Sequence, residues 1–146
     1  MQVRILGCSG TIAKGCRTTS FLLGEHVLVD AGTGVGQLTL EEMQRIDHVF
    51  LTHSHLDHIA ALPLLIDTVA DRREGPVIVH ATEATLELLK SHVFNWAIWP
   101  DFSEIAIRAD AVMQYRTIEV GQQICLGGRT ITAVPAVHTV PAVGYH

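Results

Sequence analysis

A dense cluster of three histidines and one aspartate constrains this chain more than any other feature. The apolar segment 47–51 precedes the cluster and predicts a buried strand, and the apolar segment that follows it predicts the start of a helix. Residues two apart in an extended backbone point the same way, so His53 and His55 can both reach one metal ion. Beyond the bend, Asp57 and His58 project differently and can reach a second ion beside the first. Imidazole nitrogen and carboxylate oxygen both suit zinc, so the residue types predict a metal site.

The alternative is a surface turn that is rich in histidine by chance. The chain has 9 histidines, and a single histidine is more often solvated or hydrogen-bonded than bound to a metal. Four potential ligands within one short segment, flanked by apolar residues on both sides, favour the metal site.

Length and composition predict one globular domain covering residues 1–146, since 48% of the residues are hydrophobic and only 17% are charged. The net charge of −5 argues against nucleic acid as a partner, because a nucleic-acid binder normally carries a basic patch. A small anionic substrate remains compatible with this charge, since a bound metal supplies local positive charge.

The cysteines and the hydropathy pattern indicate a cytoplasmic protein. Cys8, Cys16 and Cys125 are odd in number and follow no secretory signal, so we expect reduced, structural thiols. No segment approaches the roughly 20 apolar residues of a membrane helix, so we expect no membrane association.

Alternating apolar patterns and turn residues predict an α/β order of elements along the chain. Thr39 is the expected N-cap of one helix, Thr82 is expected to open another, and Pro63 is expected at the start of a third. We expect strands at 2–6, 19–23, 26–30, 47–51, 76–80, 112–116, 123–126 and 129–134. We expect helices at 38–45, from Pro63 to near the charged segment 71–75, and from 82 to about 93.

Three further features have two interpretations each. Asp30, at the end of a buried strand, either needs hydrogen-bond partners or simply forms a turn before Gly32. The glycine-containing segment 7–18 lacks the Lys-Ser/Thr of a nucleotide-binding loop, which favours a plain wide loop beside the site. The aromatic segment 94–102 indicates packed core or a lid, with a wall for a nucleobase as the alternative.

The run His53-x-His55-x-Asp57-His58 resembles the signature of the metallo-β-lactamase superfamily, whose members are mostly metal-dependent hydrolases. Within it, the chain looks most like the class II cyclic-nucleotide phosphodiesterases and their bacterial relatives. The resemblance implies an α/β fold, an αββα sandwich, of which the first half and part of the rest are present. It also implies that the first two histidines bind one metal and that Asp57 and His58 bind the other.

Two more residues match the superfamily's pattern. Asp30 resembles the aspartate that braces the metal-bearing loop without binding the metal itself. His138, which follows an apolar strand, resembles the histidine that completes the first metal's ligands. Three histidines with an open fourth position suffice to hold one zinc and to lower the pKa of its water to about 7.

The superfamily's bridging aspartate and last histidine have no counterpart in this sequence. We therefore expect a domain truncated at its C-terminal end, with apolar sheet surface left uncovered; a symmetric homodimer is the alternative. On its own the chain can be inactive for lack of these ligands.

The resemblance predicts a metal-dependent hydrolase that attacks cyclic nucleotides or a related small-molecule phosphodiester with metal-activated hydroxide. Asp57 would orient the nucleophile, and the complete fold would hold two zinc ions, with manganese or iron as substitutes. The alternatives are an endoribonuclease of the tRNA 3′-end type, a thioester or lactone hydrolase of the same fold, and a non-catalytic metal-binding domain.

Overall fold

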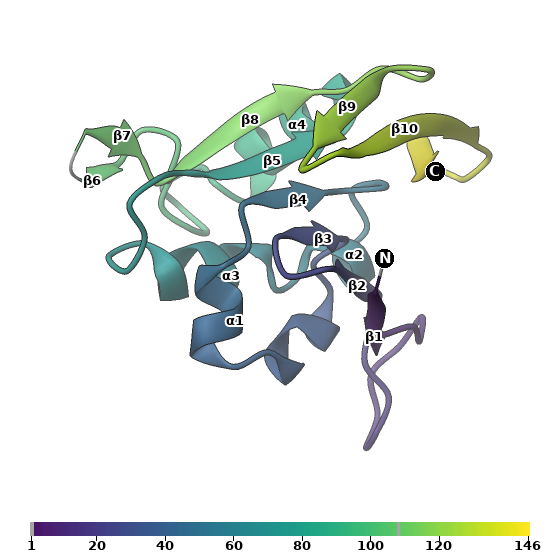
Figure 1. Cartoon of the computed structure of the whole chain (residues 1–146), viewed down its shortest axis with the longest axis horizontal. Coiled ribbons are helices and arrows are strands. Elements are labelled where there is room, and N and C mark those ends of the chain that lie inside the picture. Colours follow the sequence, from purple (N-terminus) through teal and green to yellow (C-terminus); the bar gives the residue numbers. More distant parts are fainter. Residues whose placement is uncertain (1, 108) are drawn as a thin grey trace.

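A six-stranded mixed sheet forms the centre of the protein, in a computed structural model that describes residues 2–107 and 109–146. β1 to β3 form an antiparallel meander, and β3, β4, β5 and β8 run parallel to one another. The strands of this sheet, in spatial order, are β1 (Val3–Gly7), β2 (Ser20–Leu23), β3 (Val27–Val29), β4 (His48–Phe50), β5 (Val77–Ala81) and β8 (Met113–Thr117). The helices all pack against one hydrophobic cluster on one face of this sheet. In Figure 1, α1 (Leu40–Gln44) and α3 (Leu62–Val69) lie below the central strands and α4 (Glu83–His92) lies behind β5 and β8.

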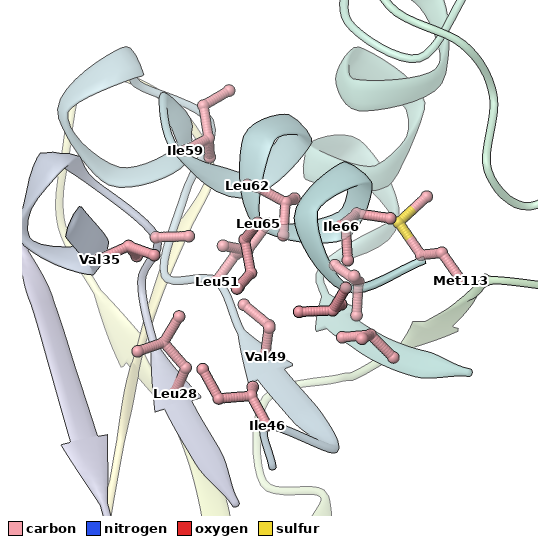
Figure 2. Packing of buried hydrophobic residues seen from close by; sticks show 14 of the residues in the cluster. Leu28, Val35, Ile46, Val49, Leu51, Ile59, Leu62, Leu65, Ile66 and Met113 are labelled. Carbon is pink, nitrogen blue, oxygen red and sulfur yellow. The ribbon is translucent and has the colours of Figure 1, made fainter. Parts of the chain in front are cut away.

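The main core lies between this sheet and the helices. Leu28, Val49 and Leu51 point into it from the central strands and meet Leu62 and Ile66 of the helix layer (Figure 2). The helices that cover this face are the 3-10 helix η1 (Thr33–Gln37), α1 (Leu40–Gln44), α2 (Leu56–Ile59), α3 (Leu62–Val69) and α4 (Glu83–His92).

A second, three-stranded sheet packs on the opposite face. It consists of β9 (Gln123–Leu126), β10 (Arg129–Ala136) and β11 (Ala142–Tyr145), with β10 in the middle. Val27 and Phe50, which alternate with the core residues of β3 and β4, pack against Ala133 of this sheet. A cavity of about 680 Å³ lies between the sheets, with mainly apolar walls, and contains none of the predicted metal ligands.

Several local predictions are confirmed. The hairpin of β2 and β3 forms as expected, Thr39 closes a capping box at the start of α1, and the side chain of Thr82 caps α4. The turn between β9 and β10 places Gly127 and Gly128 at positive φ, which only glycine adopts without strain.

The sequence did not predict four elements: η1, the strand pair β6 (Ala106–Ile107) and β7 (Asp110–Ala111), and β11. The paired strands are two residues long, too short for a periodic pattern. Helix α2, which precedes the predicted helix at Pro63, is a separate four-residue turn. Among the residues that the structure describes, no helix has the length and hydropathy needed to cross a membrane.

Candidate metal centre

The predicted ligands meet at the edge where the parallel strands end. His53 and His55 follow β4 in a segment that bends at Thr52 and Ser54, and His55 is the N-cap of α2. Asp57 and His58 lie in α2 itself, which gives them a different direction from the two preceding histidines. His138 arrives from the connection between β10 and β11, far away in sequence.

Three of the predicted ligands converge as the sequence predicted. Ring nitrogens of His53, His55 and His138 all lie within 4.8 Å of one another, and Nε2 of His138 is 3.2 Å from Nδ1 of His55. In the described part of the chain, no other set of three His, Cys, Asp or Glu residues has this geometry. Three imidazoles around one point are the donor set that zinc uses when a fourth position stays open.

His53 gives the clearest test of whether a cation fits there. Its ring is buried, and its Nε2 has no hydrogen-bond partner. Burial, followed by the neighbouring His58 and His138, lowers the pKa of His53 to about 4, so the ring is neutral at neutral pH. A buried nitrogen without a partner costs free energy, and a cation at the centre of the cluster would satisfy it. The residues present therefore fit a divalent metal.

Asp30 fixes the segment that carries the predicted ligands by hydrogen bonds to Thr52 and His58. Its carboxylate accepts hydrogen bonds from the Thr52 backbone N–H at 2.8 Å, from the Thr52 hydroxyl at 2.9 and 3.0 Å, and from Nδ1 of His58 at 2.7 Å. Asp30 is buried and has a φ of 56°, a strained conformation for a residue other than glycine. A plain turn before Gly32 explains neither the burial nor the three donors, so the bracing role fits better.

Asp57 and His58 lie next to the three-histidine cluster without joining it. Oδ2 of Asp57 is 3.3 Å from Nε2 of His58, and the His58 and His53 rings have centroids 4.1 Å apart. Burial tends to lower the pKa of His58, but the hydrogen bond and charge of Asp30, helped by Asp57, raise it above its ordinary value. The binding of a second ion by these two residues stays a prediction.

An open hollow of about 350 Å³ exposes the cluster to solvent. It is lined by the predicted ligands, by Thr52 and by Ala136, Val137, Ala142 and Val143. The aromatic segment 94–102 contributes no residue to this hollow. Phe94 and Phe102 are buried in the main core and Trp96 is 61% exposed, so the segment serves packing and does not wall the site.

The loop between β1 and β2 is anchored beside the hollow. Its last residues hydrogen-bond to the turn after β3, Thr18 to Thr33 and Thr19 to Gly32. Gly32 is packed so closely that a Cβ would lie 2.2 Å from the carbonyl oxygen of Asp57. The sequence-based interpretation of a wide loop next to the site agrees with this arrangement.

The layered α/β architecture and the histidine cluster at its strand edge define the metallo-β-lactamase class of fold. The chain belongs to the β-lactamase superfamily: the family described as "Beta-lactamase superfamily domain" matches residues 25–145. The resemblance of the histidine run to the metallo-β-lactamase superfamily and the predicted α/β fold are both confirmed.

Curated relatives include ribonuclease Z and a phosphodiesterase. Ribonuclease Z of Bradyrhizobium diazoefficiens is 30% identical over 141 residues, which cover 91% of this chain and 44% of the relative. A Yersinia pestis protein described as "Probable 3′,5′-cyclic-nucleotide phosphodiesterase" is 28% identical over 90 residues, 61% of this chain and 25% of that protein. The chain thus spans less than half the length of these relatives.

Solved structures share the fold at lower sequence identity. The metallo-β-lactamase fold protein YhfI from Bacillus subtilis has a TM-score of 0.72 at 23% identity, covering 98% of this chain and 56% of YhfI. The short form of human tRNase Z has a TM-score of 0.67 at 20% identity, covering 99% of this chain and 64% of that protein.

Proposed function

We propose that the protein hydrolyses phosphodiester bonds with the help of a divalent metal, and that its substrate is RNA. The observation that carries the proposal is the convergence of His53, His55 and His138 on one point in an open hollow. A divalent cation held there would lower the pKa of a water molecule and offset negative charge on phosphoryl oxygens.

The protein's own residues supply the rest of the chemistry. The three histidines are neutral donors that would hold the ion, and Asp30 fixes the segment that carries two of them. Asp57 lies at the wall of the hollow with its carboxylate partly exposed, in position to orient a water molecule and accept its proton. Zinc is the metal that suits three imidazoles best, with manganese and iron as substitutes.

Three observations favour RNA over the cyclic nucleotide that the sequence first suggested, and together they outweigh the net charge of −5, which by itself argues against a nucleic-acid partner. Ribonuclease Z of Bradyrhizobium diazoefficiens matches 91% of this chain, whereas the probable cyclic-nucleotide phosphodiesterase of Yersinia pestis matches 61% of it. The aromatic segment that suggested a base-stacking wall lies outside the hollow. An open site with the exposed His138 at its rim also suits a polymer better than an enclosed pocket would.

A cyclic nucleotide is the second candidate, because the Yersinia pestis relative is described as a probable cyclic-nucleotide phosphodiesterase. The substrate would then be a small phosphodiester, and His53, His55, His138 and Asp57 would have the same roles as in the cleavage of RNA.

The test compares substrates on one preparation. The purified chain is stripped with a chelator and reloaded with zinc or manganese, then given a precursor tRNA with a 3′ extension, cyclic AMP, or bis(p-nitrophenyl) phosphate. We expect metal-dependent cleavage of the RNA, lost in His138→Ala and kept in His92→Ala, an exposed histidine outside the site. Turnover of cyclic AMP alone would favour the second candidate. A metal-loaded chain that cleaves none of the three would refute phosphodiester hydrolysis for this chain.

A further inference from the structure

We propose that the Thr52 hydroxyl selects the tautomer of His53 and thereby makes Nε2 of His53 the metal-binding atom. Thr52 directly precedes the histidine cluster and lies between Asp30 and the ring of His53. This positioning role deepens the proposed function, because it rests on the metal centre described above.

The direction of each hydrogen bond follows from the groups that meet. The carboxylate of Asp30 only accepts, so both the backbone N–H and the O–H of Thr52 donate to it. A hydroxyl has one proton, and the Thr52 hydroxyl donates that proton in its hydrogen bond to Asp30. Oγ1 of Thr52 must then accept from Nδ1 of His53, 2.9 Å away, which places the ring proton of His53 on Nδ1.

The other nitrogen of His53 completes the argument. With the proton on Nδ1, Nε2 carries a lone pair, and it is this atom that is buried without a partner. It belongs to the imidazole that meets His55 and His138 at the cluster. The hydrogen bonds that link Asp30, Thr52 and His53 therefore keep a lone pair on Nε2 of His53 before any ion binds. An ion then binds without waiting for a proton to move between ring nitrogens.

A competing donor does not displace this arrangement. Nδ1 of His58 lies 3.3 Å from the Thr52 hydroxyl but 2.7 Å from Oδ2 of Asp30, so His58 donates to the carboxylate. Thr52 is also fixed from outside the network, because its carbonyl accepts from the backbone N–H of Val143 in β11 at 3.0 Å. The hydroxyl is thus held in place by both its backbone and its partners.

Two substitutions separate this role from simple packing. Thr52→Val keeps the shape of the side chain and removes the hydroxyl, while Thr52→Ser keeps the hydroxyl and removes a methyl group. Both keep the backbone N–H that binds Asp30. Thr85→Val serves as the matched control, because Thr85 is also buried and hydrogen-bonded but lies in α4, away from the ligands.

Tautomer and metal affinity are measured without substrate, so failure of the hydrolysis proposal leaves this test intact. Long-range ¹H–¹⁵N spectra of the metal-free chain near pH 7.5 should show the His53 proton on Nδ1 in the unsubstituted protein and in Thr52→Ser. Competition with a chromophoric zinc chelator should show an affinity about 10–100-fold weaker in Thr52→Val, the effect typical of losing a partner of a metal-binding histidine. Thr52→Ser should restore most of that affinity, and Thr85→Val should leave it unchanged.

Two outcomes would overturn the proposal. One is a His53 proton on Nε2 in the unsubstituted metal-free chain, which needs no variant to fold. The other is a folded Thr52→Val protein, checked by its near-ultraviolet circular dichroism, that binds zinc as tightly as the unsubstituted chain.

Discussion

Zinc should stabilise this fold by joining two parts of it that are far apart in sequence. His53 follows the central strand β4, and His138 lies after β10 of the small sheet, 83 residues beyond His55. A ligand that binds only the folded state adds about 2.7 kcal/mol to the free energy of unfolding at 100 times its dissociation constant. For a domain of this size, that gain corresponds to a rise in melting temperature of about 5–10 °C.

Removal of one imidazole should cancel this gain at little cost to the metal-free fold. His138 is exposed, so His138→Ala should change the stability of the metal-free chain by no more than about 0.5 kcal/mol. The control His92→Ala also removes an exposed histidine and should keep the full response to zinc.

Urea unfolding followed by circular dichroism, with chelator or with excess zinc, measures both quantities. A second measurement, amide hydrogen exchange, should show added protection in β10 and β11 when zinc is bound. The reasoning fails if His138→Ala keeps the zinc-dependent gain, or if zinc leaves the unsubstituted chain unchanged.

Other predictions concern stability, the packing under the site and the substrate. Burial first, then His48, lowers the pKa of His80 to about 4, below its ordinary 6.5, so the unfolded state binds the proton more readily. The stability that neutral His80 contributes should be fully present above pH 6.5 and be lost as the pH drops toward 4, by at most about 3 kcal/mol, and His80→Gln should reduce the pH dependence seen in urea titrations by that part. Gly32→Ala should destabilise the fold by about 1–3 kcal/mol in the same assay and weaken zinc binding, because its Cβ would collide with the carbonyl of Asp57. Lys14→Gln, in the exposed loop anchored beside the hollow, should weaken RNA cleavage in a salt-dependent way while hydrolysis of bis(p-nitrophenyl) phosphate stays unchanged; equal effects on both substrates would contradict an RNA contact there.

Local sequence signals predicted most of the fold, because those elements form from contacts within a few residues. The capping threonines Thr39 and Thr82 and the glycine turn of β9 and β10 depend on short-range hydrogen bonds and backbone freedom, which a sequence displays directly. β11 has no such signal. It is held by pairing with β10 and by hydrogen bonds to the end of β4, which join residues far apart in the chain.

The candidate metal site also combines residues that local sequence signals predicted with residues that depend on contacts between distant parts of the chain. Spacing alone predicted that His53 and His55 lie close together on an extended segment. Their ring centroids are 4.8 Å apart, but the backbone bends at Thr52 and Ser54 and is not a regular extended strand. His138 followed from a resemblance, since a single histidine after a strand carries little information by itself. The role proposed for Thr52 was not predicted, although Thr52 directly precedes the motif, because that role depends on where Asp30 lies. That position results from the pairing of β3 with β4.

The unpredicted strand β11 connects the fold to the site. Its Val143 N–H donates to the carbonyl of Thr52, and its Tyr145 hydroxyl donates to the carbonyl of Leu51 at 2.8 Å. Backbone groups at the end of β4 are therefore held by β11, while Asp30 holds the same segment from the other side. Because the loop carrying His138 leads directly into β11, the strand that fixes the first ligand also fixes the position from which the third one reaches it. β11 thus explains how His138, on an exposed loop, is held close to the buried His53 although no hydrophobic core surrounds that loop.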